Sequence, residues 1–469
     1  MSEHQDPHTR RTFLTRTSCG LGAATLAQLF ASRTTASAAG LPGFPNFTPR
    51  AKRIIYLHMS GGPSQLETFD PKPDLAKWDG KPLPAEVRGD QRLTTMTSGQ
   101  GAINVMASQH KFARHGQAGM DMNVLFKHMP EIADDICLIR STTTDPINHD
   151  PAVTFLQTGS PLSGRPCMGS WLSYGLGSAN ENLPAFVVLL SGGGQPVPSR
   201  YWHNGFLPSR HQGVKFQSSG DPVLFLSNPQ GMSKENRRKT IDRINALNQL
   251  KHQQSGDPEI EARIDAFQLA YRMQGSVPGL MDISREPKSV LESYGAQPGK
   301  ASFAANCLLA RRLAEAGVRF IQLYDRGWDH HDGITNAIKG KINAVDRPST
   351  ALLQDLKERG MLEDTLVIWG GEFGRTTYAQ TRNKNFGRDH HPRCFSMWMA
   401  GGGVKPGMIH GSSCAFGYNV AENPVHVHDL QATILQLLGI DHQALTFRFK
   451  GRDFRLTDVH GKVVKEILA

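Results

Sequence analysis

The segment RFIQLYDRGWDHHDG, residues 319–333, decides the fold class of this chain. A short apolar run passes directly into a polar loop that holds three aspartates and two adjacent histidines. A continuous apolar run of this length is typical of a strand that is buried on both faces of a parallel sheet. The same form recurs in RIIYLHM (53–59), ICLIRS (136–141), AFVVLL (185–190) and TLVIWGG (365–371).

Helical patterns separate these strand-like runs, at residues 300–316, 342–359 and 426–440. Alternating strands and helices predict an α/β fold with a mostly parallel central sheet and helices on both faces. Residues 231–275 are rich in Lys, Arg, Glu and Gln, which indicates a helical insertion. We therefore expect one domain over residues 39–469 that carries this insertion.

The N-terminus has the pattern of a twin-arginine export signal over residues 1–38. Arg10 and Arg11 precede a mildly apolar stretch at 21–31, and small residues at 36–38 form a cleavage site. The apolar stretch is too short to span a membrane, and the alternative is a frayed N-terminal helix. The signal predicts a periplasmic or secreted protein.

Composition excludes several classes of function. The net charge is +10, but no block of Lys and Arg interleaves with aromatic residues, so we expect no nucleic-acid partner. Phosphate-binding Walker loops, G-x-S-x-G elbows and dinucleotide fingerprints are all missing from the sequence. After the signal there is no candidate membrane span. A basic surface suits anionic substrates or polymers.

Candidate metal ligands follow the predicted strands. Asp329 and His331 come after residues 319–324, Glu372 follows 365–371, and GRDHHPRC supplies His390 and His391. Ligands collect at the carboxyl ends of strands in open α/β sheets. Mixed imidazole and carboxylate ligands favour Zn²⁺ or Mn²⁺, with Ca²⁺ as another choice. The alternatives are a polar loop with capping aspartates, a surface histidine pair and a tight glycine turn.

Further residues are candidates for catalysis or metal binding. Asp70, in HMSGGPSQLETFDPKP, is a weaker metal candidate near the first strand end. Arg375 and Arg388 have the chemistry to stabilise a phosphate or sulfate group. His149, in NHDPAVTFLQTG, stands where a nucleophile is expected before a helix. An imidazole there serves as metal ligand, general base or covalent acceptor, or it is a buried structural residue.

These motifs, together with WDHH, GGEFGRT and the ending DLQATILQLLGI, resemble the bacterial family called domain of unknown function 1501. That family resembles the alkaline phosphatase and sulfatase superfamily. The resemblance implies an alkaline-phosphatase-like three-layer sandwich that holds one or two metals at its strand ends. It also implies hydrolysis of phosphate or sulfate esters.

The sequence departs from the motifs of the superfamily in two segments. TLVIWGGEFG aligns with the superfamily's TLVIFTSDHG, so Glu372 takes the place of a metal-binding Asp and Phe373 that of a metal-binding His. HDPAVTFLQTG overlays the sulfatase signature, but His149 stands in place of the cysteine that becomes formylglycine. Formylglycine chemistry is therefore not expected.

Two functions remain open at this stage. The first is an exported metal-dependent hydrolase of phosphate or sulfate esters, in which water or His149 attacks the substrate. The second is a non-catalytic protein that binds anionic polysaccharide or a partner protein at the same cleft. The dense supply of His and carboxylate residues favours the first, whereas the replacements at His149 and Phe373 favour the second.

Overall fold

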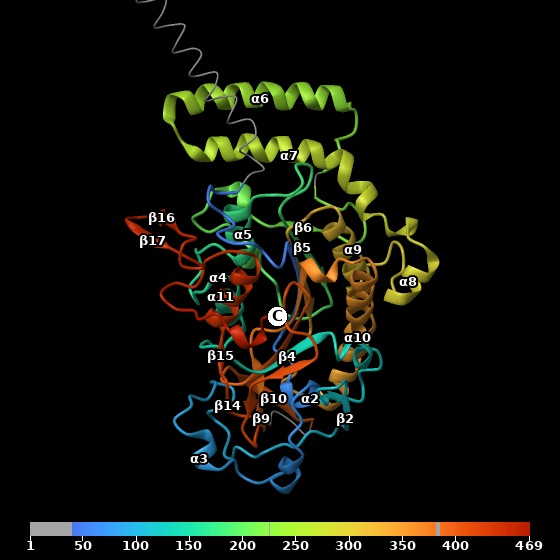
Figure 1. Cartoon of the computed structure of the whole chain (residues 1–469), viewed down its shortest axis with the longest axis vertical. Coiled ribbons are helices and arrows are strands. Elements are labelled where there is room, and N and C mark those ends of the chain that lie inside the picture. The colour runs from blue at the N-terminus through green and yellow to red at the C-terminus, as the bar shows by residue number, and fades with distance from the viewer. Residues whose placement is uncertain (1–39, 225, 381–384) are drawn as a thin grey trace, which may run out of the picture.

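A nine-stranded sheet forms the centre of the described chain, in the order β12-β4-β11-β8-β1-β7-β5-β6, with β15 paired to β4 (Figure 1). The computed structural model describes residues 40–224, 226–380 and 385–469, so the export signal predicted for 1–38 lies outside the described residues. The strands are β1 (Arg53–Ser60), β4 (Ile136–Thr143), β5 (Phe186–Ser191), β6 (Val214–Phe216), β7 (Phe320–Arg326), β8 (Thr365–Gly370), β11 (Phe395–Ala400), β12 (Met408–His410) and β15 (Val425–His426).

The sheet is mostly parallel, as predicted. Every pairing within it is parallel except those of β11, which runs antiparallel to both β4 and β8. In β1 every residue after Arg53 is buried. This pattern suits a central parallel strand that is covered on both faces.

Two helical layers cover the sheet, and the side chains of β1 alternate between them. Ile55 and Leu57 belong to the core formed with α9 (Phe303–Glu315) and α10 (Ile334–Glu358). Ile54 and Tyr56 belong to the opposite core, with α4 (His149–Thr158), α5 (Met168–Leu176) and α11 (Val427–Leu437). Successive residues of a strand point to opposite faces, so one short run supplies both cores. The predicted three-layer α/β fold is confirmed.

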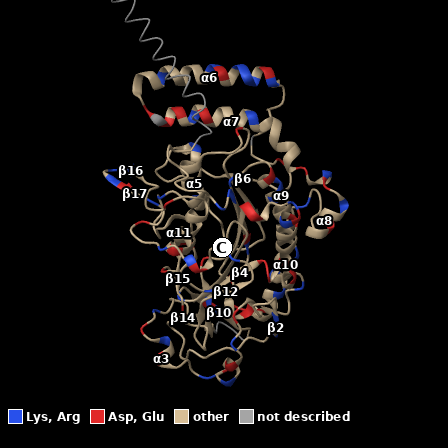
Figure 2. Cartoon of the chain, viewed as in Figure 1, with Lys and Arg blue, Asp and Glu red and all other residues tan. Residues whose placement is uncertain are grey.

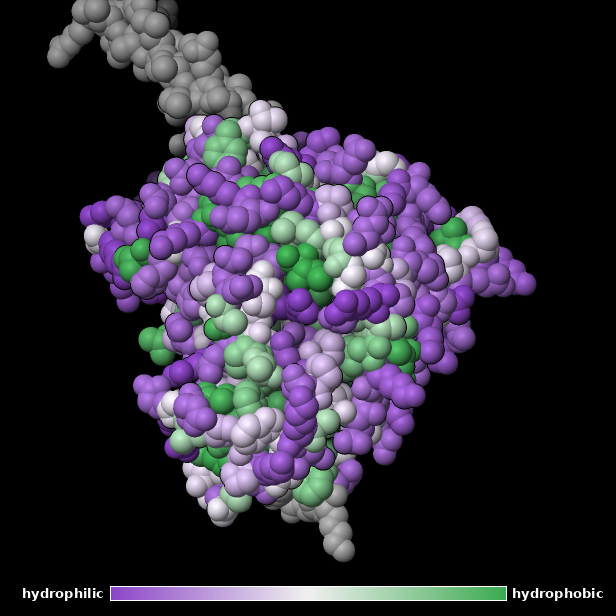
Figure 3. Space-filling model, turned by 60° about the horizontal axis from the view of Figure 1, so that its bottom comes forward, coloured by the Kyte–Doolittle hydropathy of each residue, from purple (hydrophilic) through white to green (hydrophobic). Residues whose placement is uncertain are grey.

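Residues 231–275 fall on α6 (Lys234–Ser255) and α7 (Pro258–Met281), which form an antiparallel pair at one end of the molecule (Figure 1). Both helices carry charged residues of both signs (Figure 2). The face in Figure 3 is mainly hydrophilic, with hydrophobic residues in small separate groups. No helix in the described ranges is both long enough and apolar enough to cross a bilayer.

A smaller two-stranded sheet, β9 (Gly374–Gln380) and β10 (Gly387–His391), lies in the chain between β8 and β11. The remaining α-helices and strands are short: α2 (Gln65–Thr68), α3 (Ala85–Arg88), α8 (Lys288–Tyr294), β2 (Phe112–His115), β3 (Met120–Asn123), β13 (Ser412–Ser413), β14 (Val420–Glu422), β16 (Phe447–Phe449) and β17 (Arg452–Phe454). In the register of the large sheet, Ser60 of β1 lies opposite Arg326 of β7, and His58 lies opposite Gly370 of β8. The loops after these three strands therefore begin at one edge.

Candidate metal centre

The loop after β7 is held tightly against the loop after β1. The Trp328 amide donates to the Ser60 carbonyl at 3.2 Å, and the buried indole of Trp328 donates to Asp325 at 3.1 Å. A side chain at Gly61 would place its Cβ 2.5 Å from the Asp329 nitrogen, and Gly61 has a positive φ of 116°. Only glycine allows this approach, which fixes the position of Asp329.

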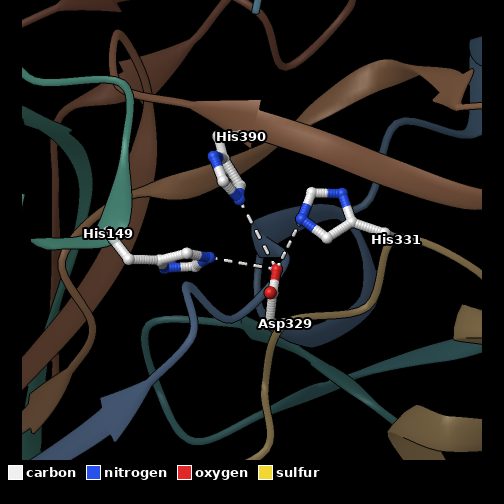
Figure 4. Close-up of side chains that lie close together, drawn as sticks. All are labelled: His149, Asp329, His331 and His390. Carbon is white, nitrogen blue, oxygen red and sulfur yellow. Dashed lines mark ion pairs between the residues drawn. The ribbon is translucent and has the colours of Figure 1, made fainter. Parts of the chain in front are cut away.

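His149 and His390 reach the same place from other parts of the chain. His149 is the first residue of α4, which begins after the loop that follows β4. His390 lies on β10 and pairs with Arg375 on β9. His331 follows Asp329 in the β7 loop by two residues. Four side chains from three separate segments therefore meet at the edge of the sheet (Figure 4).

The three histidines of the group converge on one carboxylate oxygen of Asp329. Asp329 Oδ1 lies 2.8 Å from Nε2 of His331, 3.1 Å from Nε2 of His149 and 3.5 Å from Nε2 of His390 (Figure 4). The candidate ligand atoms of all four residues lie within 4.8 Å of one another. His390 is buried, and the other three residues are half-buried.

The other ring nitrogen of each histidine contacts a hydrogen-bond acceptor. Nδ1 of His149 lies 2.6 Å from Glu372 Oε1, and Nδ1 of His390 lies 2.9 Å from the carbonyl oxygen of Ile147. Nδ1 of His331 contacts the amide oxygen of Gln380. These acceptors orient each ring so that its Nε2 atom faces Asp329.

This arrangement fits a cation. Burial, together with the positive charge of Arg375, lowers the pKa of His390 to about 4, so its ring is neutral near pH 7. Within the described part of the chain, the buried Nε2 atoms of His149 and His390 make no hydrogen bond. Three imidazole nitrogens and a carboxylate oxygen thus face one another within the span of one ion, which is the donor set of a divalent-metal site. Three imidazoles and one carboxylate suit Zn²⁺ or Mn²⁺ better than Ca²⁺.

Glu372 lies behind His149 rather than in the group of four. It is almost fully buried, and besides Nδ1 of His149 it accepts the Gly61 amide at 3.0 Å and approaches Nε2 of His58 at 3.4 Å. Burial opposes its charge, but the contacts with His149 and His58 outweigh burial and hold the pKa of Glu372 well below its ordinary value. Glu372, predicted as a metal ligand, contacts Nδ1 of His149 and does not belong to the group of four.

The two candidate arginines are buried and engaged by the protein itself. Arg375 donates to Asp329 Oδ1 at 2.6 Å, to the Gly62 carbonyl at 2.9 Å and to the Gly61 carbonyl. Arg388 forms a two-pronged pair with the buried carboxylate of Glu67, with a shortest contact of 2.8 Å. Protein acceptors therefore occupy both guanidinium groups, that of Arg375 beside the group of four and that of Arg388 in the buried pair with Glu67.

Two predicted metal ligands lie outside the group. His391 points away from His390 and contacts Gln91 through Nδ1 at 3.1 Å and the Tyr418 carbonyl through Nε2. Burial lowers its pKa to about 4. Asp70 pairs with Lys72 at 2.9 Å and accepts from Ser413. Adjacent residues of a strand point to opposite faces, which separates His391 from His390.

Two contacts of the site were not foreseen from the sequence. Phe373 is fully buried, and its ring centroid lies 4.9 Å from that of His149 and 4.7 Å from that of His390. The Gln195 amide donates to Oδ2 of Asp329. Gln195 follows three glycines directly after β5, and its place at the carboxyl end of a strand is the signal that would have found it.

A family model described as Protein of unknown function (DUF1501) matches residues 51–468. The chain belongs to this family. The match covers all four residues of the DUF1501 chain that converge at the candidate metal centre, together with Glu372. No curated protein matches the sequence.

Among solved structures, this DUF1501 chain is similar to Ps i-CgsB at 12% identity with a TM-score of 0.38, over 83% of this chain and 72% of that one. It is similar to the PsFucS1 sulfatase from Pseudoalteromonas sp. at 12% identity with a TM-score of 0.35, over 83% and 68%. A mutant TAB5 alkaline phosphatase with Mg bound is 12% identical with a TM-score of 0.32, over 83% and 98%.

Proposed function

We propose that this protein is an exported, metal-dependent hydrolase of phosphate or sulfate esters. The observation that carries the proposal is the convergence of three Nε2 atoms and one carboxylate oxygen, with each Nδ1 held by an acceptor. Histidines with this second contact are typical of metal ligands. Sulfated polysaccharide and small anionic esters are the proposed substrates.

In this proposal Asp329, His149, His331 and His390 hold a divalent cation, Zn²⁺ or Mn²⁺. The cation would supply a Lewis acid for an anionic ester at the edge of the sheet. Glu372 fixes the ring of His149, and Arg375 balances the charge of Asp329. His149 thereby becomes a ligand rather than a covalent acceptor, because both of its nitrogens are committed.

A second candidate function is non-catalytic binding of anionic polysaccharide or of a partner protein. The engagement of Arg375 and Arg388 by protein carboxylates favours it, because neither guanidinium faces an incoming anion. Phe373 favours it too, since an apolar ring lies against His149 and His390 where another ligand would add binding strength.

Metal analysis and ester hydrolysis separate the two candidates. We expect purified wild-type protein to hold close to one equivalent of Zn²⁺ or Mn²⁺, and Asp329→Ala and His390→Ala to hold none. His442→Ala is the matched control, because His442 is buried against Thr457 Oγ1 and lies outside the group. The metal-loaded wild type should hydrolyse an aryl phosphate or an aryl sulfate, and His149→Ala should lose both metal and turnover.

A folded, metal-free wild type would refute the proposed metal centre. A wild type that binds metal and sulfated polysaccharide, yet turns over no ester in a broad screen, would establish the second candidate instead. Circular dichroism on each variant separates loss of metal from loss of fold.

A further inference from the structure

The two oxygens of Asp329 have different surroundings. Oδ1 faces His149, His331 and His390 and accepts from Arg375. Oδ2 accepts from the side-chain amide of Gln195. Gln195 is half-buried on a loop that is otherwise largely exposed, so it lies at the boundary between the candidate metal centre and solvent.

Hydrogen bonds connect the loop that carries Gln195 to the strand end and loop that carry Asp329. Ser191 Oγ donates to Asp325 at 2.9 Å, and the Arg326 guanidinium donates to the carbonyls of Ser191 and Gly192. A Cβ on Gly192 would lie 2.6 Å from the Arg326 carbonyl, and Gly192 has a φ of 71°. Glycine is needed for this approach, which holds the two loops in close contact.

We propose that Gln195 is a positioning residue that limits Asp329 to one metal-binding oxygen. Carboxylates bind cations through one oxygen or through both, and the second mode fills an additional coordination position. A catalytic site needs a position that stays open for substrate or water. By engaging Oδ2, Gln195 keeps that position open. This inference rests on the proposed metal centre and adds a residue that determines how that centre is used.

The test compares Co²⁺-loaded wild type with Gln195→Met, which keeps the length of the side chain and removes the amide. We expect the visible absorption spectrum of Co²⁺, which reports its coordination number, to change in Gln195→Met. Ser199→Ala, a substitution at the exposed first residue of the 3-10 helix that follows this loop (Ser199–Trp202), should leave the spectrum unchanged. For ester hydrolysis we expect a ~10-fold fall in kcat with little change in KM, as for other residues that orient metal ligands.

Each outcome decides a separate point. A wild-type spectrum and wild-type kcat in Gln195→Met would overturn the role of Gln195 while leaving the metal centre intact. A wild type that takes up no Co²⁺ would overturn the proposed function and this inference with it. Should Gln195→Met fail to fold, Gln195→Asn serves as the second variant, because its shorter amide cannot reach Oδ2 and should give the same spectral change.

Discussion

Replacing Glu372 by glutamine should weaken divalent-metal binding without abolishing it. Glu372 contacts Nδ1 of His149 at 2.6 Å and does not belong to the four residues whose ligand atoms converge. Partners that orient a ligand histidine contribute ~10–100-fold to metal affinity. That range corresponds to about 1.4–2.7 kcal/mol of binding free energy. Glutamine keeps the shape of Glu372 but removes the negative charge that holds the proton on Nδ1.

Competition titration with a Zn²⁺ chelator measures this change. Asp346→Asn is the matched control, because Asp346 is also a buried carboxylate, accepts the backbone amides of residues 127–129 and does not belong to the group of four. Its loss should lower stability and leave metal affinity unchanged. Glu372→Gln that binds no metal, like Asp329→Ala, would show that Glu372 is a ligand and refute the reasoning. Unchanged metal affinity in Glu372→Gln would show that Glu372 does not support metal binding, and it would refute the reasoning as well.

Three further predictions concern the rest of the chain. Arg388→Lys should lower the free energy of unfolding by roughly 3 kcal/mol, because it breaks the buried two-pronged pair with Glu67, and denaturant unfolding with metal analysis should show the metal retained. Burial, together with the charge of Arg210, lowers the pKa of His211 to about 3 in the folded protein, whereas in the unfolded chain it is roughly 6.5. The stability that neutral His211 contributes is therefore fully present above pH ~6.5 and is lost as the pH falls toward about 3. His211→Gln should therefore lose stability less steeply on acidification, by up to about 1.4 kcal/mol per pH unit in urea unfolding, and an unchanged slope would contradict this assignment. Exchanging Arg10 and Arg11 for lysine should leave the precursor in the cytoplasm, and cell fractionation that still finds the protein exported would remove the twin-arginine interpretation.

The strands of the sheet could be predicted because burial on both faces leaves a continuous apolar run, as in residues 53–59 and 365–371. The position of Asp329 and His331 after such a run also pointed to the candidate metal centre. Side-chain direction could not be predicted in the same way. Residues 387–391 form β10, and the alternation of side chains along a strand turns His390 toward Asp329 and His391 toward Tyr418.

Buried charge was the other feature that the sequence did not reveal. Arg375 and Arg388 follow the strand ends where an anion would be held, but each is paired with a carboxylate far away in the sequence. A pairing such as Arg388 with Glu67 depends on which loops meet in space, and it cannot be predicted from the spacing of residues along the chain. The same holds for Gln195, whose partner Asp329 lies on another strand end.

The candidate ligands come from three segments that meet only when the sheet has formed, since His149 follows β4, Asp329 follows β7 and His390 lies just before β11. If the predicted twin-arginine signal at residues 1–38 directs export, the protein folds before it leaves the cytoplasm. The cation would then be captured in the cytoplasm, where metal availability is controlled, and carried out inside the folded protein. Selectivity between Zn²⁺ and Mn²⁺ would thus be decided by the compartment of folding rather than by the compartment of action.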